Sequence, residues 1–146
     1  MDSCRVAVLS TLARDPAGFP YGSMVEVAFD ERGRPILLLS RLAEHTQNLL
    51  ARAEASIVVA EDYGERVMTS ARVTLLGPCA PIPDEGEARL ARELYLRVHP
   101  AARTYVEFGD FRFYRLEPVA IRYIGGFGKM AWVPPQPYAD AGRATP

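Results

Sequence analysis

Residues 40–50 read SRLAEHTQNLL and follow an uninterrupted apolar run at residues 36–39. A short apolar run bounded by polar residues is typical of a buried strand. Serine at its end is a favoured helix N-cap, because the hydroxyl accepts a hydrogen bond from a backbone N–H of the first turn. We therefore predict a buried strand leading into a short helix that begins at Ser40, with its leucines facing a core.

Three polar side chains of this predicted helix share one side. Arg41 and His45 are four residues apart, and His45 and Asn48 are three apart, which makes them neighbours on a helix. The free N–H groups and the dipole of a helix N-terminus favour a phosphate or another anion. Ser40 and these three side chains therefore indicate an anion seat. The alternative is a capped amphipathic helix whose polar face meets only solvent.

The composition describes a globular domain of low net charge. The chain has 146 residues, 49% of them apolar, and a formal net charge of −1, which suits one domain with one core. No broad basic field favours nucleic acid or an anionic membrane as a partner. No apolar run approaches the ~18 residues of a membrane-spanning helix, and the N-terminus lacks a signal-peptide layout. Cys4 and Cys79 are too few for a disulfide framework, so we expect free thiols in a cytoplasmic protein.

Alternating and apolar segments predict a mainly β fold. The predicted strands are residues 6–12, 21–29, 35–39, 55–60, 72–76, 111–116 and 119–124. Residues 79–82 are predicted to continue the fifth strand beyond a bulge. Hairpin connections, and too few helices to cover a parallel sheet, favour a six- to seven-stranded antiparallel β-barrel with flanking helices.

The second predicted helix, Glu85–Val98, has the clearest start and stop signals. Asp84 precedes it and Glu87 lies three residues later, in a variant of the capping box. Pro100 ends it, because the residue before proline avoids the α region. Its apolar stripe consists of Leu90, Leu94 and Val98, with Ala91 and Tyr95 beside it.

Residues 1–133 are predicted to form the domain, and residues 134–146 a proline-rich tail that is extended or disordered. The glycines of GGFG, residues 125–128, do not form a dinucleotide fingerprint, because no crossover helix follows them. The sequence offers no nucleophile–base pair and no carboxylate cluster, which argues against a hydrolase.

Seven segments, taken in order along the chain, carry a resemblance to a known family. They are LST (9–11), YGS (21–23), SRLAEHTQNL (40–49), ARVTLLG (71–77), HP (99–100), DFRFYRLEP (110–118) and IGGFGKMAW (124–132). Together they resemble the FMN-binding split-barrel superfamily related to pyridoxamine 5′-phosphate oxidase. Within it they are most similar to the haem-utilisation branch, whose members bind or degrade haem. The resemblance covers roughly residues 5–133.

The resemblance implies a homodimer of split barrels with two cofactor sites at the interface, each built from both chains. In flavin-binding relatives the FMN phosphate lies near the strand-to-helix junction, which here corresponds to Ser40, Arg41, His45 and Asn48. The other residues implied at the cofactor are Ser23 on the paired strand, Arg72 on a later strand, and Lys129 and Trp132 across the interface.

An exposed apolar patch is also expected, because large apolar patches on a soluble chain usually mark an interface. We expect it to combine Trp132 with the aromatic strand of Phe111, Phe113 and Tyr114. This patch predicts a two-fold symmetric homodimer.

Three functions stay open on this resemblance. The first is an FMN-dependent oxidoreductase acting on a small-molecule substrate, the second a haem-binding or haem-degrading protein, and the third a cofactor-free binding module. Haem-degrading relatives use a histidine near the C-terminus as iron ligand, and Asp110 corresponds to a residue that in relatives holds it. Here the only histidines are His45 and His99, and His99, at a helix end, is expected to be structural or exposed. We therefore expect weak haem binding and place FMN first.

Overall fold

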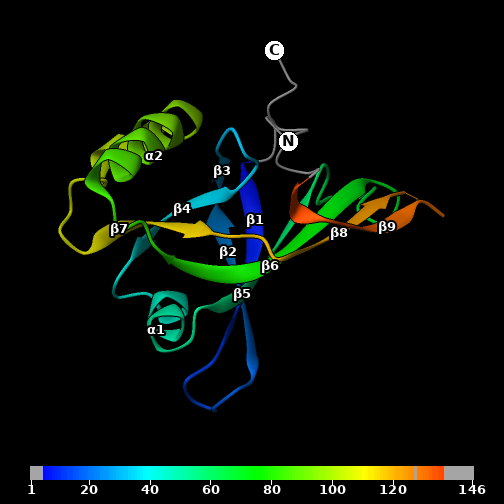
Figure 1. The fold of residues 1–146 in the computed structure, drawn as a ribbon, viewed down its shortest axis with the longest axis horizontal. Helices are drawn as coiled ribbons and strands as arrows, with labels where there is room; N and C mark the ends of the chain where they lie inside the picture. Colours follow the sequence, from blue (N-terminus) through cyan, green and yellow to red (C-terminus); the bar gives the residue numbers. More distant parts are fainter. Residues whose placement is uncertain (1–4, 127, 137–146) are drawn as a thin grey trace.

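A computed structural model describes residues 5–126 and 128–136, which fold into a curled antiparallel sheet flanked by two α-helices (Figure 1). The strands are β1 Val6–Leu12, β2 Pro20–Glu26, β3 Ala28–Phe29, β4 Pro35–Ser40, β5 Glu54–Ala60, β6 Ala71–Pro81, β7 Phe111–Leu116, β8 Ala120–Gly125 and β9 Met130–Val133. The helices are α1 Glu44–Ala51 and α2 Glu85–Val98, followed by the 3-10 helix η1 Pro100–Thr104. The predicted mainly β barrel with flanking helices is confirmed.

Neighbouring strands follow the order β2-β1-β5-β6-β7-β4-β3, and the hairpin β8–β9 adds to β6. β6 has eleven residues and pairs with different strands along its length. Its residues 71–76 pair with β8, whereas residues 79–81 pair with β7. The change of partner occurs around Gly77, where a Cβ atom would lie 1.9 Å from the carbonyl oxygen of Glu117. Only glycine permits so close an approach. Where the sequence predicts a bulge, the structure has one continuous strand that changes its pairing partner.

The sheet curls around a core of inward-facing side chains. Leu9 of β1, Ile57 of β5 and Leu75 of β6 are fully buried there. β4 is buried on both faces, as its uninterrupted apolar run predicts. A second apolar cluster lies between the sheet and α2, and contains Leu38 of β4 and Tyr95 of α2. The barrel is thus filled with side chains and not hollow.

α1 begins later than the sequence predicts. Its first residue is Glu44 and its N-cap position is Ala43, which makes no side-chain capping hydrogen bond. Ser40 remains the last residue of β4, paired with Phe111, and its hydroxyl accepts a hydrogen bond from the N–H of Leu42 at 3.1 Å. The prediction that Ser40 caps the helix is wrong, because strand pairing holds this serine until the chain has turned.

α2 is the second predicted helix with the predicted bounds, and the Asp84 side chain accepts a hydrogen bond from the N–H of Glu87 at 2.8 Å. The predicted apolar stripe is wrong at Leu90, which is 67% exposed. Residues four apart share a side of a helix, and the buried side is the one with Ala91 and Tyr95. The large ring of Tyr95 packs toward the sheet, and this rotation leaves Leu90 in solvent.

The predicted strand at residues 21–29 is divided into β2 and β3 at Val27. The N–H of Val27 donates to the carbonyl of Arg5 at 3.0 Å, and its own carbonyl accepts a hydrogen bond from His99 Nε2 at 2.8 Å. Val27 therefore leaves the ladder and lets the chain pass from the edge beside β1 to the edge beside β4.

The C-terminal region contains a strand that the sequence did not predict. β9 pairs with β8, and Trp132 lies opposite Arg122. Gly126, in the turn between them, has a positive φ, which glycine adopts readily. Residue 127 of this predicted turn and residues 137–146 of the predicted tail lie outside the described residues, as does Cys4.

Cys79 is a buried free thiol, and burial raises its pKa to about 12. None of the helices in the described part of the chain is long and apolar enough to cross a membrane.

Candidate functional site

A groove of about 280 Å³ lies where the barrel does not close, between the edge strand β2 and the end of β4. Residues 24–26 of β2 and 38–40 of β4 form two of its walls. Most of its lining is apolar, and its polar side chains are Glu26, Ser40, His45, Tyr95 and Tyr105. Two predicted site residues, Ser40 and His45, therefore meet at one groove.

His45, in the first turn of α1, is the chemically distinctive residue of the groove. Its Nδ1 lies 3.1 Å from Oγ of Ser23 on β2, another predicted site residue, and its Nε2 makes no hydrogen bond with any described residue. Burial lowers the pKa of His45 below its ordinary value, because desolvation disfavours the charged ring. When Nδ1–H donates to Ser23, the neutral ring offers the Nε2 lone pair to a ligand.

His99, the other histidine, is buried and structural, which is one of the two roles that the sequence leaves open. It is 7% exposed, and its Nε2 donates to the carbonyl of Val27 at 2.8 Å. Its Nδ1 lies 3.8 Å from a carboxylate oxygen of Glu26, and that carboxylate also accepts a hydrogen bond from the Tyr105 hydroxyl at 3.1 Å. Since both ring nitrogens face protein oxygens, His45 is the histidine that remains for a ligand.

The corner between β4 and α1 is held by Asp110. The Ser40 hydroxyl donates to Asp110 Oδ2 at 2.6 Å, and the carbonyl of Asp110 accepts a hydrogen bond from the N–H of Arg41 at 2.7 Å. Asp110 therefore fixes a turn here. Because the hydroxyl of Ser40 is committed to this carboxylate, it is not a free donor for a phosphate. Arg41 is exposed and lines a separate pocket together with Arg112.

Asn48 does not join the predicted anion seat. Its side chain is fully buried, its Nδ2 donates to Thr11 Oγ1 at 3.1 Å, and its Oδ1 accepts a hydrogen bond from the N–H of Arg14 at 3.2 Å. These bonds fasten α1 to β1. The four-residue seat predicted from helical spacing is therefore wrong, because the side of α1 that carries Asn48 packs on the barrel.

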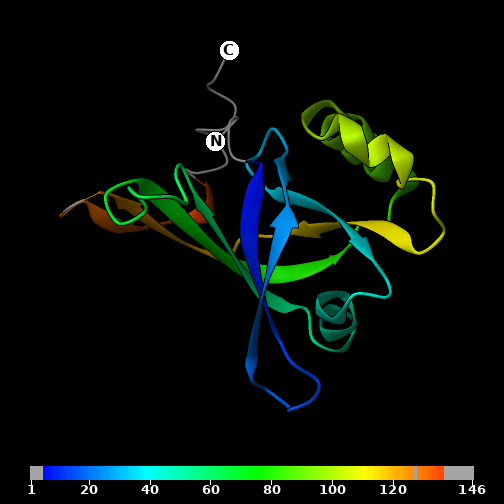
Figure 2. The ribbon, with the colours of Figure 1, turned by 180° about the vertical axis from the view of Figure 1, so that it is seen from behind.

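Trp132 lies at the far end of the sheet from His45. It ends a row of directly paired residues that crosses six strands, namely Met24, Val8, Val58, Thr74, Arg122 and Trp132. Neighbouring strands are about 4.8 Å apart, so Trp132 lies ~24 Å from the Met24 wall of the groove along the sheet. Figure 2 shows the β8–β9 hairpin projecting away from α1.

Arg72 and Lys129, also predicted at the cofactor, belong to this distant part of the sheet. Arg72 Nη1 donates to the carbonyls of Val67 and Met68 at 3.3 Å each, so this side chain holds the loop before β6. The carbonyl of Lys129 accepts a hydrogen bond from the N–H of Gly125 in the β8–β9 turn. A single chain therefore does not bring Arg72, Lys129 and Trp132 to the groove.

The expected interface patch is correct only in part. Trp132 is 63% exposed, and the Arg122 guanidinium lies 5.5 Å from its ring centroid. Tyr114, by contrast, is 2% exposed, and Phe111 and Phe113 pack in the cluster beneath α2. The aromatic strand β7 is therefore not a surface patch, because α2 covers one of its faces and the barrel core the other.

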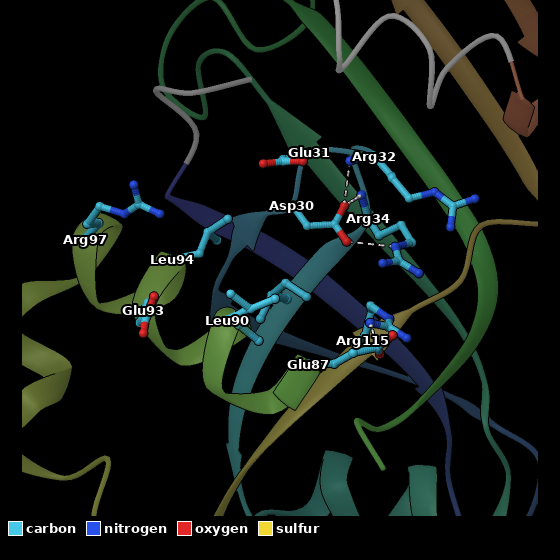
Figure 3. Close-up of a pocket in the computed structure, with 12 residues that line it drawn as sticks. Asp30, Glu31, Arg32, Arg34, Glu87, Leu90, Glu93, Leu94, Arg97 and Arg115 are labelled. Carbon is cyan, nitrogen blue, oxygen red and sulfur yellow. Dashed lines mark hydrogen bonds and ion pairs between the residues drawn. The ribbon is translucent and has the colours of Figure 1, made fainter. Parts of the chain in front are cut away.

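A further hollow of about 310 Å³ lies between the β3–β4 turn and α2 (Figure 3). Arg34 pairs with Asp30 at 2.7 Å, and Arg115 pairs with Glu87 at 2.8 Å. Glu117 accepts from both arginines. These charged side chains pair with one another and form an ion-pair network that connects the β3–β4 hairpin, β7 and α2. We therefore interpret the hollow as structural.

Several groove residues were missed by sequence reasoning, among them Met24, Glu26 and Tyr105. Alternation along residues 21–29 marks Met24 and Glu26 as sharing one face of a strand. Nothing in the sequence shows that β2 ends the sheet and that its edge meets β4, because this depends on the order of distant strands.

Residues 1–140 match the family model described as CREG, beta-barrel. The chain belongs to this family. Its predicted place in the FMN-binding split-barrel superfamily, among haem-related members, is confirmed. Over 119 residues, 82% of its length, the chain is 43% identical to the chloroplastic non-canonical haem oxygenase HOZ of Arabidopsis thaliana, of which it covers 36%.

Two solved structures have the same fold. The haem-binding protein of Mycobacterium smegmatis is 34% identical, with a TM-score of 0.87 over 94% of this chain and 56% of that chain. ChuZ of Campylobacter jejuni shares the fold, with a TM-score of 0.79 at 18% identity over 92% of this chain and 56% of that chain. The chain thus spans little more than half of these two proteins and about a third of the plant relative.

Proposed function

We propose that this chain binds haem in the groove between β2 and β4 and takes part in haem degradation or haem utilisation. The observation that carries the proposal is the 43% identity to a non-canonical haem oxygenase over 82% of the chain. The likeness to a mycobacterial haem-binding protein supports it. FMN was placed first because residues 134–146 contain no histidine. That argument has less weight because His45 lies in the groove.

The chemistry of the groove fits haem. Met24, Val25, Leu38 and Phe111 give it apolar walls suited to a porphyrin face. His45 offers a neutral imidazole, and histidine is the usual proximal ligand of haem iron. Haem, when bound, supplies iron and oxygen chemistry, while the chain supplies the ligand, the dry walls and the Ser23 contact that orients the His45 ring.

We also propose that a second copy of the chain covers the groove. Pockets that enclose drug-sized ligands have volumes of ~300–1,000 Å³, so a groove of about 280 Å³ does not enclose haem. The outer face of the sheet carries the exposed apolar side chains Val6, Met24, Met130 and Trp132. A two-fold dimer through this face is the arrangement that brings Trp132 and Lys129 to the partner's groove.

Haem titration into purified protein tests the haem proposal. We expect a saturable Soret band, a shift in that band for His45→Gln, and its return when free imidazole is added, because imidazole replaces the missing ligand. Arg103→Gln, an exposed change on η1, is the control and should leave the spectrum unaltered. Saturable binding of FMN, together with no saturable haem spectrum, would contradict the haem proposal and favour the FMN-dependent oxidoreductase instead.

Light scattering tests the proposed dimer separately. A dimer mass at micromolar concentration is expected for the wild type, and Trp132→Glu should shift the mass toward the monomer by placing a charge in the apolar face. A monomer mass for the wild type contradicts the proposal that a second copy covers the groove. If that monomer binds haem, the proposal of haem binding in the groove still holds.

A further inference from the structure

Four titratable side chains meet at one wall of the groove between β2 and β4. They are Glu26 of β2, Tyr95 of α2, His99 at the C-cap of α2, and Tyr105 directly after η1. Glu26, Tyr95 and Tyr105 line the groove, whereas His99 is buried. Iron ligation by His45 requires none of these four groups, although Glu26 is the acidic residue of the groove lining.

The surroundings of His99 fix the position of its ring hydrogen. Its Nε2 lies 2.8 Å from the carbonyl oxygen of Val27, and since a carbonyl oxygen can only accept, Nε2 carries the hydrogen. The Nδ1 atom of the neutral ring is then bare, and it faces Oε1 of Glu26 at 3.8 Å, beyond hydrogen-bond length. Two acceptors therefore face each other, and one proton added to Nδ1 converts them into a charge-assisted pair.

The two tyrosines beside this pair do not exchange protons near neutral pH. The Tyr105 hydroxyl donates to Oε2 of Glu26 at 3.1 Å. Burial raises the pKa of Tyr105, and the Glu26 carboxylate raises it further. The pKa of Tyr95 is likewise raised, first by burial and then by Glu26. Both phenols therefore stay protonated, and a proton taken up at this wall goes to His99 or Glu26.

A ligand that covers the groove changes the surroundings of Glu26. The side chain of Glu26 is 50% exposed, so water solvates its carboxylate in the open groove. A bound ligand removes this water, and an ionised carboxylate that loses its solvent is costly unless an opposite charge lies nearby. A proton on Nδ1 of His99 supplies that charge directly beside Oε1.

We propose that His99 and Glu26 form a proton-binding site in the wall of the groove, which takes up one proton when haem binds. The proton comes from solvent and bonds to Nδ1 of His99, and no bond of the porphyrin is broken. The coupling to haem rests on the proposed function. By linkage, the affinity for haem then rises as the pH falls, by up to about tenfold per pH unit for one proton.

His45 does not produce this effect. Burial lowers the pKa of His45, so its ring is already neutral near pH 7 and exchanges no proton when it binds a ligand. The pH dependence of haem affinity is therefore assigned to the pair at the other histidine.

Soret titrations between about pH 6.5 and pH 8 test this site. We expect the haem affinity of the wild type to rise several-fold for each pH unit by which the pH falls. Glu26→Gln keeps an acceptor for Tyr105, and His99→Gln keeps a donor for Val27, yet both should reduce this rise to less than about twofold. Glu93→Gln, which removes the same charge from an exposed position on α2, is the matched control and should keep the slope of the wild type.

A flat pH dependence in the wild type overturns the proposal, as does a slope that Glu26→Gln leaves unchanged. The absence of a saturable Soret band instead refutes haem binding itself, and a double-mutant cycle of Glu26→Gln and His99→Gln then tests the pair without ligand. In urea unfolding we expect the coupling between the two residues to be near zero at about pH 8 and to raise the urea midpoint at about pH 5.5. No coupling at either pH overturns the proton site, whether or not haem binds.

Discussion

Replacement of Asn48 by alanine separates a structural role from a role at the cofactor. The Asn48 side chain is fully buried, donates to Thr11 Oγ1 and accepts from the N–H of Arg14. Each of these hydrogen bonds contributes about 1 kcal/mol net. The groups left unpaired add a further desolvation cost of up to about 2 kcal/mol. We therefore expect a loss of about 2–4 kcal/mol in the free energy of unfolding.

Urea unfolding followed by circular dichroism measures this loss, provided that the transition is two-state. Gln47→Ala is the matched control on the same helix. The Gln47 amide donates to the carbonyl of Arg41 in an exposed position, so its removal should cost less than about 1 kcal/mol. Haem and FMN affinities are measured in the same variants, under conditions where both variants are folded.

The structural assignment predicts a large loss of stability with unchanged affinity of the folded protein. A loss below about 1 kcal/mol, accompanied by weaker binding of haem or FMN, would refute it. That result would mean that Asn48 faces the cofactor, as its helical spacing from His45 suggested.

Four further outcomes are expected. Gly77→Ala should cost about 3 kcal/mol or more, because the new Cβ would lie 1.9 Å from the carbonyl oxygen of Glu117; a near-normal thermal midpoint contradicts this close approach. Thr46→Val should stabilise the protein by about 1 kcal/mol, since the described residues offer no partner to the buried Thr46 Oγ1, and a lower urea midpoint contradicts it. Cys79, whose pKa burial raises to about 12, should be labelled by a thiol reagent only after denaturation, as peptide mapping by mass spectrometry can check. The lowered pKa of His45 means that its contribution to stability is complete above about pH 6.5 and is lost as the pH falls through its folded-state pKa; this part of the pH dependence should vanish in His45→Gln.

Regular patterns in the sequence predict the elements of this fold well. Alternation and apolar runs give β1 and β7 with their observed bounds, and the Asp84 cap gives α2. β9 escapes prediction because four residues are too few to show a period. The start of α1 escapes because the pairing of Ser40 with Phe111 outweighs the local preference of serine for an N-cap.

The candidate site is less predictable, because it depends on which strands meet. Ser40 and His45, both predicted at the cofactor, line the groove, and Ser23 contacts His45. Asn48 turns to the barrel because α1 packs there on β1. Arg112, which lines a pocket together with Arg41, is distant from it in sequence, and the pairing of β4 with β7 brings the two residues to the same end of the barrel.

The pairing of β4 with β7 also has a consequence for synthesis. Leu38 pairs with Phe113, so β4 has no partner on that edge until most of the domain has left the ribosome. At ~5–20 residues per second, this wait lasts on the order of several seconds. During that time the strand Pro35–Ser40, buried on both faces in the finished protein, is an exposed aggregation-prone segment. We therefore expect a chaperone to protect β4 while the chain is being made.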